Sequence, residues 1–158
     1  MSKHPVPDAA QVKDLLGFLF DGLAVKAAPK LDISPTSGSF LAVYVADDGS
    51  PVALAACNIA FAANAGAGLS MLPLAAAKEA AKNKLLTPAM NDNLREVMNI
   101  CSRLMLRDGS AHLRLEQVCQ ANALPPAAAA IVSAATGRAD FEVTLGKYGI
   151  GALSILTV

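Results

Sequence analysis

The chain has 158 residues, which suits one domain, and 54% of them are apolar against 16% charged. This composition excludes a disordered chain, because disordered segments are polar and usually charged. Lys plus Arg (13) equals Asp plus Glu (13), so the net charge is zero and nucleic-acid binding by bulk charge is not expected. Alanine accounts for 32 residues, and because each buries little area, the core must be broad or shared with a partner.

The first half of the chain predicts a helix, a strand hairpin and a second, alanine-rich helix. Apolar residues recur at helical spacing from Asp8 to Lys26, with Asp8 as the N-cap, whereas residues 27–38 predict a loop. The hairpin consists of strands 39–46 and 51–58 around the turn 47–50. Residues 59–72 are ambiguous, and we favour a buried helix weakened by two glycines.

The second half predicts two further long helices, a strand, a short helix and a closing hairpin. These elements are a helix from Pro73 to about Lys84, a third helix from Thr87-Pro88 to about Leu106, a turn at 107–110, a strand at 111–119, a short helix within 123–137 and a hairpin at 141–158 that turns at Gly149 and Gly151. The order indicates one domain, residues 1–158, of the mixed α/β (α+β) class with an antiparallel sheet. We expect residues 1–7 to form a flexible tail.

The third helix separates an apolar face from a compact polar one. At about 100° per residue, one stripe carries the apolar residues Leu94, Val97, Met98, Cys101, Leu104 and Met105. The opposite arc carries Asp92, Glu96, Asn99 and Arg103. On geometry alone, such an arc is more often a solvated surface than a functional site.

The spacing Asp92-x-x-x-Glu96-x-x-Asn99 resembles the motif of the CheX/CheC/FliY family of response-regulator phosphatases, in which Asp or Ser stands at the first position. A proline follows the motif in that family, and here Pro125 follows after 25 residues. The order of elements over about 38–158 is also similar, and the single motif is closest to the CheX type. The resemblance implies a CheC-like fold, with an antiparallel-rich sheet packed against long helices, and a homodimer.

The activity implied by the resemblance is dephosphorylation of a CheY-like receiver domain. Asn99 would position the hydrolytic water, Glu96 would pair with the receiver's lysine, and Asp92 would support them. Mg²⁺ is expected in the receiver, with no cofactor or metal in this chain. Arg103 and Arg95 would contact the partner, although Arg103, one turn beyond Asn99, could instead block docking. The alternative is a non-catalytic CheX-like binding or scaffold protein in chemotaxis or two-component signalling.

Other features predict structure rather than chemistry. The uncharged stretches 49–77 and 117–137 are broken by Asn, Gly or Pro, so we expect no membrane span. No secretion signal is evident, and Cys57, Cys101 and Cys119 suit reduced thiols of a cytoplasmic protein. The Gly66-Ala-Gly68 sequence fits helix packing better than phosphate binding, and His112 lacks partners at metal-ligand spacing.

Overall fold

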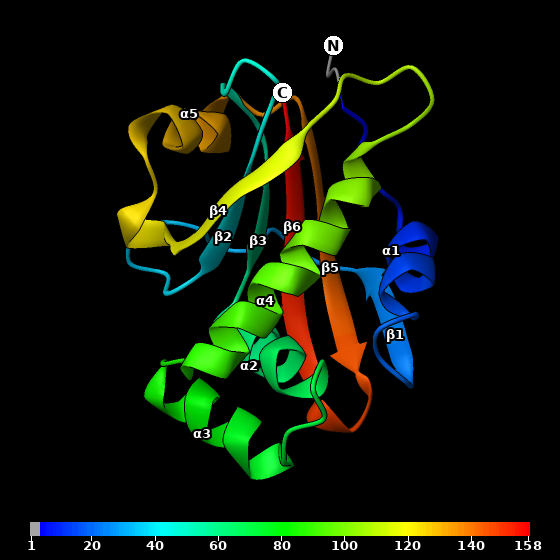
Figure 1. Cartoon of the computed structure of the whole chain (residues 1–158), viewed down its shortest axis with the longest axis vertical. Helices are drawn as coiled ribbons and strands as arrows, with labels where there is room; N and C mark the ends of the chain where they lie inside the picture. Colours follow the sequence, from blue (N-terminus) through cyan, green and yellow to red (C-terminus); the bar gives the residue numbers. More distant parts are fainter. Residues whose placement is uncertain (1–3) are drawn as a thin grey trace.

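A six-stranded sheet organises residues 4–158, the part of the chain that this computed structural model describes (Figure 1). The strands lie in the order β1-β5-β6-β3-β2-β4, and every neighbouring pair is antiparallel. Their bounds are Leu23–Ala27 for β1, Phe40–Val45 for β2, Pro51–Cys57 for β3, Arg114–Gln120 for β4, Gly137–Leu145 for β5 and Ile150–Thr157 for β6. β1 and β4 are therefore the two edge strands.

Helices cover both faces of this sheet. One face carries α1 (Ala9–Leu16), α2 (Ile59–Gly68), α3 (Leu74–Asn83) and α4 (Pro88–Cys101), whereas α5 (Pro126–Ala134) packs on the other. Three 3-10 turns complete the described part of the chain: η1 (Ser102–Met105), η2 (Ala121–Ala123) and η3 (Gly146–Tyr148). α4 crosses the front of the sheet diagonally and is the longest of these helices, with 14 residues (Figure 1).

Strand alternation divides the core into two layers. Successive side chains of a strand point to opposite faces, so Ala42 and Tyr44 of β2 enter the larger core while Leu41 and Val43 enter the smaller one under α5. All six residues of β2 are buried for this reason. Alanine is abundant in both the sheet and α2, which lets these layers approach closely.

Gly66 sets the distance between α2 and α4. A side chain there would bring its Cβ within 2.9 Å of the Met90 carbonyl oxygen, so only glycine permits this approach. The Asn93 side chain then donates hydrogen bonds to the Gly66 carbonyl and to Ser70, each at 2.8 Å. Gly66 thus serves helix packing, and α4 is held firmly on α2.

The first helix is shorter than the sequence predicts. Asp8 caps it as expected, with a reciprocal bond to Gln11, but the helix ends at Leu16. Residues 23–27 form β1 instead of continuing the helix, because Gly22 adopts a positive φ of 68° and redirects the chain. The spacing of Leu23 fits a helix and a strand equally well, so it wrongly predicted that the first helix continues past Gly22.

Two smaller expectations concern the N-terminal tail, which stays a prediction, and the last hairpin, where the expected turn is wrong. The flexible tail expected over residues 1–7 falls partly outside the described residues, but His4 and Pro7 are buried and the His4 ring bonds the Met105 carbonyl at 3.2 Å. Gly151 lies inside β6 rather than in the turn. A Cβ at Gly151 would lie 2.4 Å from the Phe61 Cα, so the glycine is required by the close passage of α2.

The other predicted elements are confirmed within a few residues. The β2–β3 hairpin, α2, α3, α4, β4, the proline-opened α5 and the β5–β6 hairpin all lie in the expected order. Among residues 4–158, no helix is both long enough and apolar enough to cross a membrane.

Arg138 and Asp140 of β5 tie the segment before β2 to the sheet. The Asp140 carboxylate accepts hydrogen bonds from Arg138, from the Ser154 hydroxyl and from the Leu31 amide, and Arg138 also donates to the Leu31 carbonyl. Burial by itself would raise the pKa of Asp140, but these bonds and the charge of Arg138 outweigh it and lower the pKa below its ordinary value.

Replacing this carboxylate, by Asp140→Asn, should lower the free energy of unfolding by about 2 kcal/mol at pH 7, because Arg138 loses its charged partner. A lowered folded-state pKa stabilises the fold above the unfolded value of about 4, and this contribution is lost as the pH falls through the folded-state pKa. Denaturant titrations should therefore show the difference from wild type narrowing at acidic pH. The exposed Asp108→Asn should change stability by less than about 0.5 kcal/mol; an equal effect of the two variants would contradict the assignment.

Candidate functional site

α4 begins at the residues that the sequence predicts, and its apolar and polar faces lie on the predicted sides. The Thr87 hydroxyl accepts a hydrogen bond from the Met90 amide at 3.2 Å and Pro88 occupies the first turn, so the start of the helix is fixed. Its buried residues are Met90, Leu94, Val97, Met98 and Cys101. Asp92, Glu96 and Asn99 are exposed on the opposite side, which confirms the predicted separation of faces.

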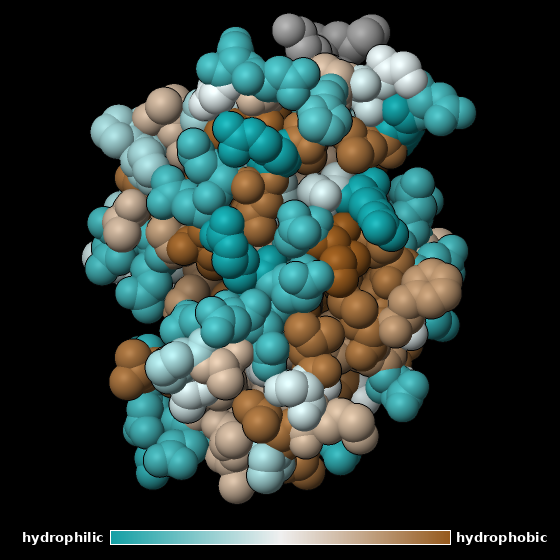
Figure 2. Space-filling view, in the orientation of Figure 1, coloured by the Kyte–Doolittle hydropathy of each residue, from teal (hydrophilic) through white to brown (hydrophobic). Residues whose placement is uncertain are grey.

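Four of the predicted site residues border one hollow. Asp92, Arg95, Glu96 and Asn99 line it together with Leu115 of the edge strand β4, and its volume is about 350 Å³. Figure 2 shows a continuous hydrophilic surface over the middle of α4. The site is an exposed ridge beside a shallow hollow, whereas an enzyme acting on a small metabolite would need a deep pocket.

The polar groups of this site are available to a partner. Within residues 4–158, no ion pair engages the carboxylates of Asp92 or Glu96, and the Asn99 carboxamide makes no hydrogen bond. Only the backbone of Asn99 is engaged, since its carbonyl accepts from the Ser102 hydroxyl at 2.7 Å. The Asn99 carboxamide and the carboxylates of Asp92 and Glu96 can therefore all form hydrogen bonds with a partner.

Arg95 links α4 to the edge of the sheet. Its guanidinium donates a long hydrogen bond, 3.4 Å, to the Glu116 carbonyl of β4. It also lines a second hollow of about 460 Å³, which includes Phe40, Leu86 and Val118. Arg95 thus lies between a polar hollow and a more apolar one, and the predicted role in partner binding remains a prediction.

Arg103 does not share the hollow of Asn99. The α-helix ends at Cys101 and η1 continues with about three residues per turn, so side chains beyond Asn99 leave the predicted arc. Arg103 borders a different hollow with Gln11, Asp14 and Phe18, on the side of α1. Arg103 therefore borders a different hollow from Asp92, Glu96 and Asn99. Its contact with a partner, or the alternative that it blocks docking, stays a prediction.

Tyr44 contacts α4 close to the point where the α-helix gives way to η1, and the sequence prediction missed this contact. Its buried hydroxyl donates to the Met98 carbonyl at 2.6 Å, directly before Asn99. The Ser102 amide bonds the Asn99 carbonyl rather than that of Met98, which tightens the chain into η1. A tyrosine within the apolar strand FLAVYV was the available signal, because a buried hydroxyl needs a partner.

The cysteines are unpaired thiols without catalytic character. Burial is the main cause that raises the pKa of Cys57, and the neighbouring Cys101 raises it further. Burial also raises the pKa of Cys101, to about 12. Burial also raises the pKa of Cys119. A nucleophilic cysteine needs a lowered pKa, so none of the three suits that role.

Histidine supplies no metal centre in the described part of the chain. His112 pairs through Nδ1 with the exposed carboxylate of Asp47 at 2.8 Å, and His4 lies under η1. Within residues 4–158, no three His, Cys, Asp or Glu side chains are grouped as metal ligands would be.

No protein-family model and no curated protein sequence matches the chain. Its fold does match solved structures. FliM in the FliM–SpeE complex from H. pylori aligns with a TM-score of 0.56 at 10% identity, over 94% of this chain and 78% of that one. The FliM middle domain from Vibrio alginolyticus aligns with a TM-score of 0.50 at 10% identity, over 94% and 87%. The FliM middle domain has a CheC-like fold, which confirms the expected fold class without singling out the CheX type.

Removing the hydroxyl that bonds α4, by Tyr44→Phe, should lower the free energy of unfolding by about 1–2 kcal/mol, because the Met98 carbonyl is left buried without that donor. Denaturant unfolding followed by circular dichroism measures the change. Tyr148→Phe is the matched control, since its hydroxyl bonds the Leu72 carbonyl at the same 2.6 Å but the residue is only half-buried. A loss for Tyr44→Phe no larger than for the control would contradict the role given to Tyr44.

Proposed function

We propose that the chain is a cytoplasmic protein that docks α4 on a phosphorylated CheY-like receiver domain and hydrolyses its aspartyl phosphate. The observation that carries this proposal is the pairing of Glu96 and Asn99. Their side chains are exposed, lack partners within residues 4–158, and border one hollow from positions one helical turn apart. Such a ridge fits a partner that brings its own reacting group.

The proposed hydrolysis requires this chain only to position the attacking water. Water attacks phosphorus in line with the aspartyl oxygen, the P–O bond to the aspartate breaks, and the receiver carboxylate leaves while the water proton passes to phosphate or solvent. A carboxamide both donates and accepts hydrogen bonds, so Asn99 can hold that water without a change in its own protonation. Mg²⁺ belongs to the receiver, where it neutralises charge on the phosphoryl oxygens.

Glu96 and Asp92 would serve docking rather than bond cleavage. A receiver site carries a lysine beside the phosphoaspartate, and an unpaired carboxylate one turn before Asn99 can form an ion pair with it. Charge pairs of this kind fix register and speed association more than they add affinity. Asp92, four residues earlier, keeps the local potential negative and favours the same cation, and Arg95 borders the docking surface from the side of β4.

The second candidate is a non-catalytic receiver-binding or scaffold protein. Its support is the fold shared with FliM, one of whose structures is a complex with SpeE. In this case α4 would contact the partner in the same place, but Asn99 would not affect the phosphate. The two candidates differ only in the fate of the phosphoryl group.

Asn99→Ala decides between them. If the chain is a phosphatase, the variant should dephosphorylate a phosphorylated CheY-like receiver about 100-fold or more slowly than wild type, because the water is no longer oriented. The measurement is loss of phosphate from the purified receiver with time. The exposed Asn83→Ala at the end of α3 serves as the matched control and should retain the wild-type rate. Binding without any acceleration by wild type would favour the scaffold.

Glu96→Gln separates docking from chemistry. Loss of the carboxylate should raise KM for the phosphorylated receiver about tenfold, whereas kcat should change less, because the ion pair is formed in docking. The effect should shrink at high salt, which screens exposed charges. The exposed Glu79→Gln on α3 should leave both constants unchanged. A fall in kcat with an unchanged KM would contradict a docking role.

A further inference from the structure

A second hollow adjoins the one at Asn99, and we call it the β4 hollow. It has a volume of about 460 Å³ and lies between the first half of α4, the residues that precede α4 and the end of the edge strand β4. Its large apolar side chains are those of Phe40, Leu85, Leu86 and Val118. Asp92 and Arg95 line both hollows, so the two form one continuous surface.

Leu85 is the exposed apolar residue of this surface. It is 72% exposed, although its backbone is fixed between α3 and α4 by a hydrogen bond from its amide to the Ala80 carbonyl at 3.1 Å. The next residue, Leu86, is buried in the core instead. An apolar side chain on a fixed backbone suits the anchoring of a partner, because binding then orders little of the chain.

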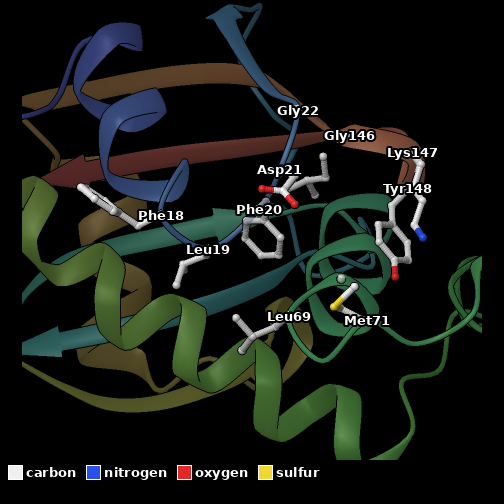
Figure 3. A pocket seen from close by; sticks show the side chains of 12 residues that line it. Phe18, Leu19, Phe20, Asp21, Gly22, Leu69, Met71, Gly146, Lys147 and Tyr148 are labelled. Carbon is white, nitrogen blue, oxygen red and sulfur yellow. The ribbon is translucent and has the colours of Figure 1, made fainter.

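The most exposed apolar side chains of the described chain lie elsewhere. Phe18 and Met71 are 89% and 81% exposed, and both line a hollow of about 500 Å³ between the turn after α1, the end of α2 and the β5–β6 turn (Figure 3). That hollow shares no lining residue with the β4 hollow or with the hollow of Asn99. Within residues 4–158, Leu85 is therefore the one large, exposed apolar residue that lines the surface continuous with Asn99.

The polar ridge of α4 is too small to hold a receiver domain by itself. A specific protein interface buries about 800 Å² on each partner and has an apolar centre, whereas the hollow of Asn99 has one apolar lining residue, Leu115. The reacting group of a CheY-like domain lies in a crevice outside the carboxyl ends of its strands, among the loops that follow them. When Asn99 reaches into that crevice, these loops must cover the surface that adjoins it, and the β4 hollow is part of that surface.

We propose that the β4 hollow is a docking subsite for the receiver domain: Leu85 packs against a loop beside the phosphoaspartate, and an apolar side chain of that loop enters the hollow. This inference rests on the proposed function, because one receiver occupies both hollows. Arg95 lies where the hollows meet, so its guanidinium can exchange the long bond to the Glu116 carbonyl for an acidic group of the receiver. The subsite contributes affinity, whereas Asn99 acts on the phosphate.

Leu85→Ser separates the subsite from the chemistry. In the Asn99→Ala background, which preserves the phosphate during the measurement, it should raise the Kd for a phosphorylated CheY-like receiver about tenfold, because the apolar anchor is lost. In the otherwise unchanged chain it should raise KM more than it lowers kcat. Phe18→Ser is the matched control, since it removes a similarly exposed apolar side chain from the other hollow, and it should leave the Kd unchanged. Isothermal titration calorimetry measures the Kd, and circular dichroism verifies each fold.

Cys119 gives a second readout without a substitution in the hollow. It lines the β4 hollow and is only partly buried, whereas Cys57 and Cys101 are buried. A bound receiver should slow the alkylation of Cys119 by N-ethylmaleimide at least about fivefold, because the thiol is then covered. Mass spectrometry of the Asn99→Ala chain, with and without the phosphorylated receiver, measures the rate.

The outcomes distinguish this inference from the proposed function. If wild type accelerates dephosphorylation but Leu85→Ser leaves the Kd unchanged, or the receiver leaves the alkylation of Cys119 unchanged, the subsite is overturned and the function stands. If Leu85→Ser weakens binding and the receiver protects Cys119, but wild type does not accelerate dephosphorylation, the subsite is supported and the chain is a scaffold. A wild-type chain that binds no phosphorylated receiver overturns both.

Discussion

The close approach of α4 to α2 is the constraint on which the rest of the structure depends. Gly66 permits it, Met90 fills the contact, and Asn93 fixes it through the end of α2. With this side of α4 committed to α2 and the sheet, the opposite side must face solvent. The polar ridge is therefore a consequence of the packing, and its residues cannot retreat into the core without dismantling the layer.

The sheet also acts on α4, through Tyr44. Its hydroxyl donates to the Met98 carbonyl just before Asn99, where the Ser102 amide bonds the Asn99 carbonyl instead. Asn99 thus occupies the last turn of regular α-helix, with Ser102 bonded to its carbonyl. A strand buried on both faces thus contacts α4 at the residue before Asn99, so the core and the candidate site are neighbours along one helix.

Much of this arrangement was predictable from local patterns. Helical spacing and the Thr87-Pro88 start placed α4 correctly, and the motif spacing brought Asp92, Glu96 and Asn99 to one face. The errors arose where tertiary contacts outweigh local preference. Leu23 lies in β1, where it pairs with Leu145 of β5, and Arg103 lies in η1, beyond the end of the α-helix that the sequence predicts to continue. The hollow lined by Phe18, Leu69 and Tyr148 unites three segments that lie far apart in the sequence, so no local pattern could have predicted it.

The order of strands has a consequence for how the molecule is made. β6 lies in the middle of the sheet, between β5 and β3, although it is the last of the six strands to be synthesised. Until β6 has left the ribosome, β1 and β5 cannot join β3, β2 and β4, and two partial sheets with open edges must wait. Contacts of such long sequence separation slow folding and expose strand edges to other chains. The helices that pack over the early strands first must therefore keep the nascent protein from associating with other chains.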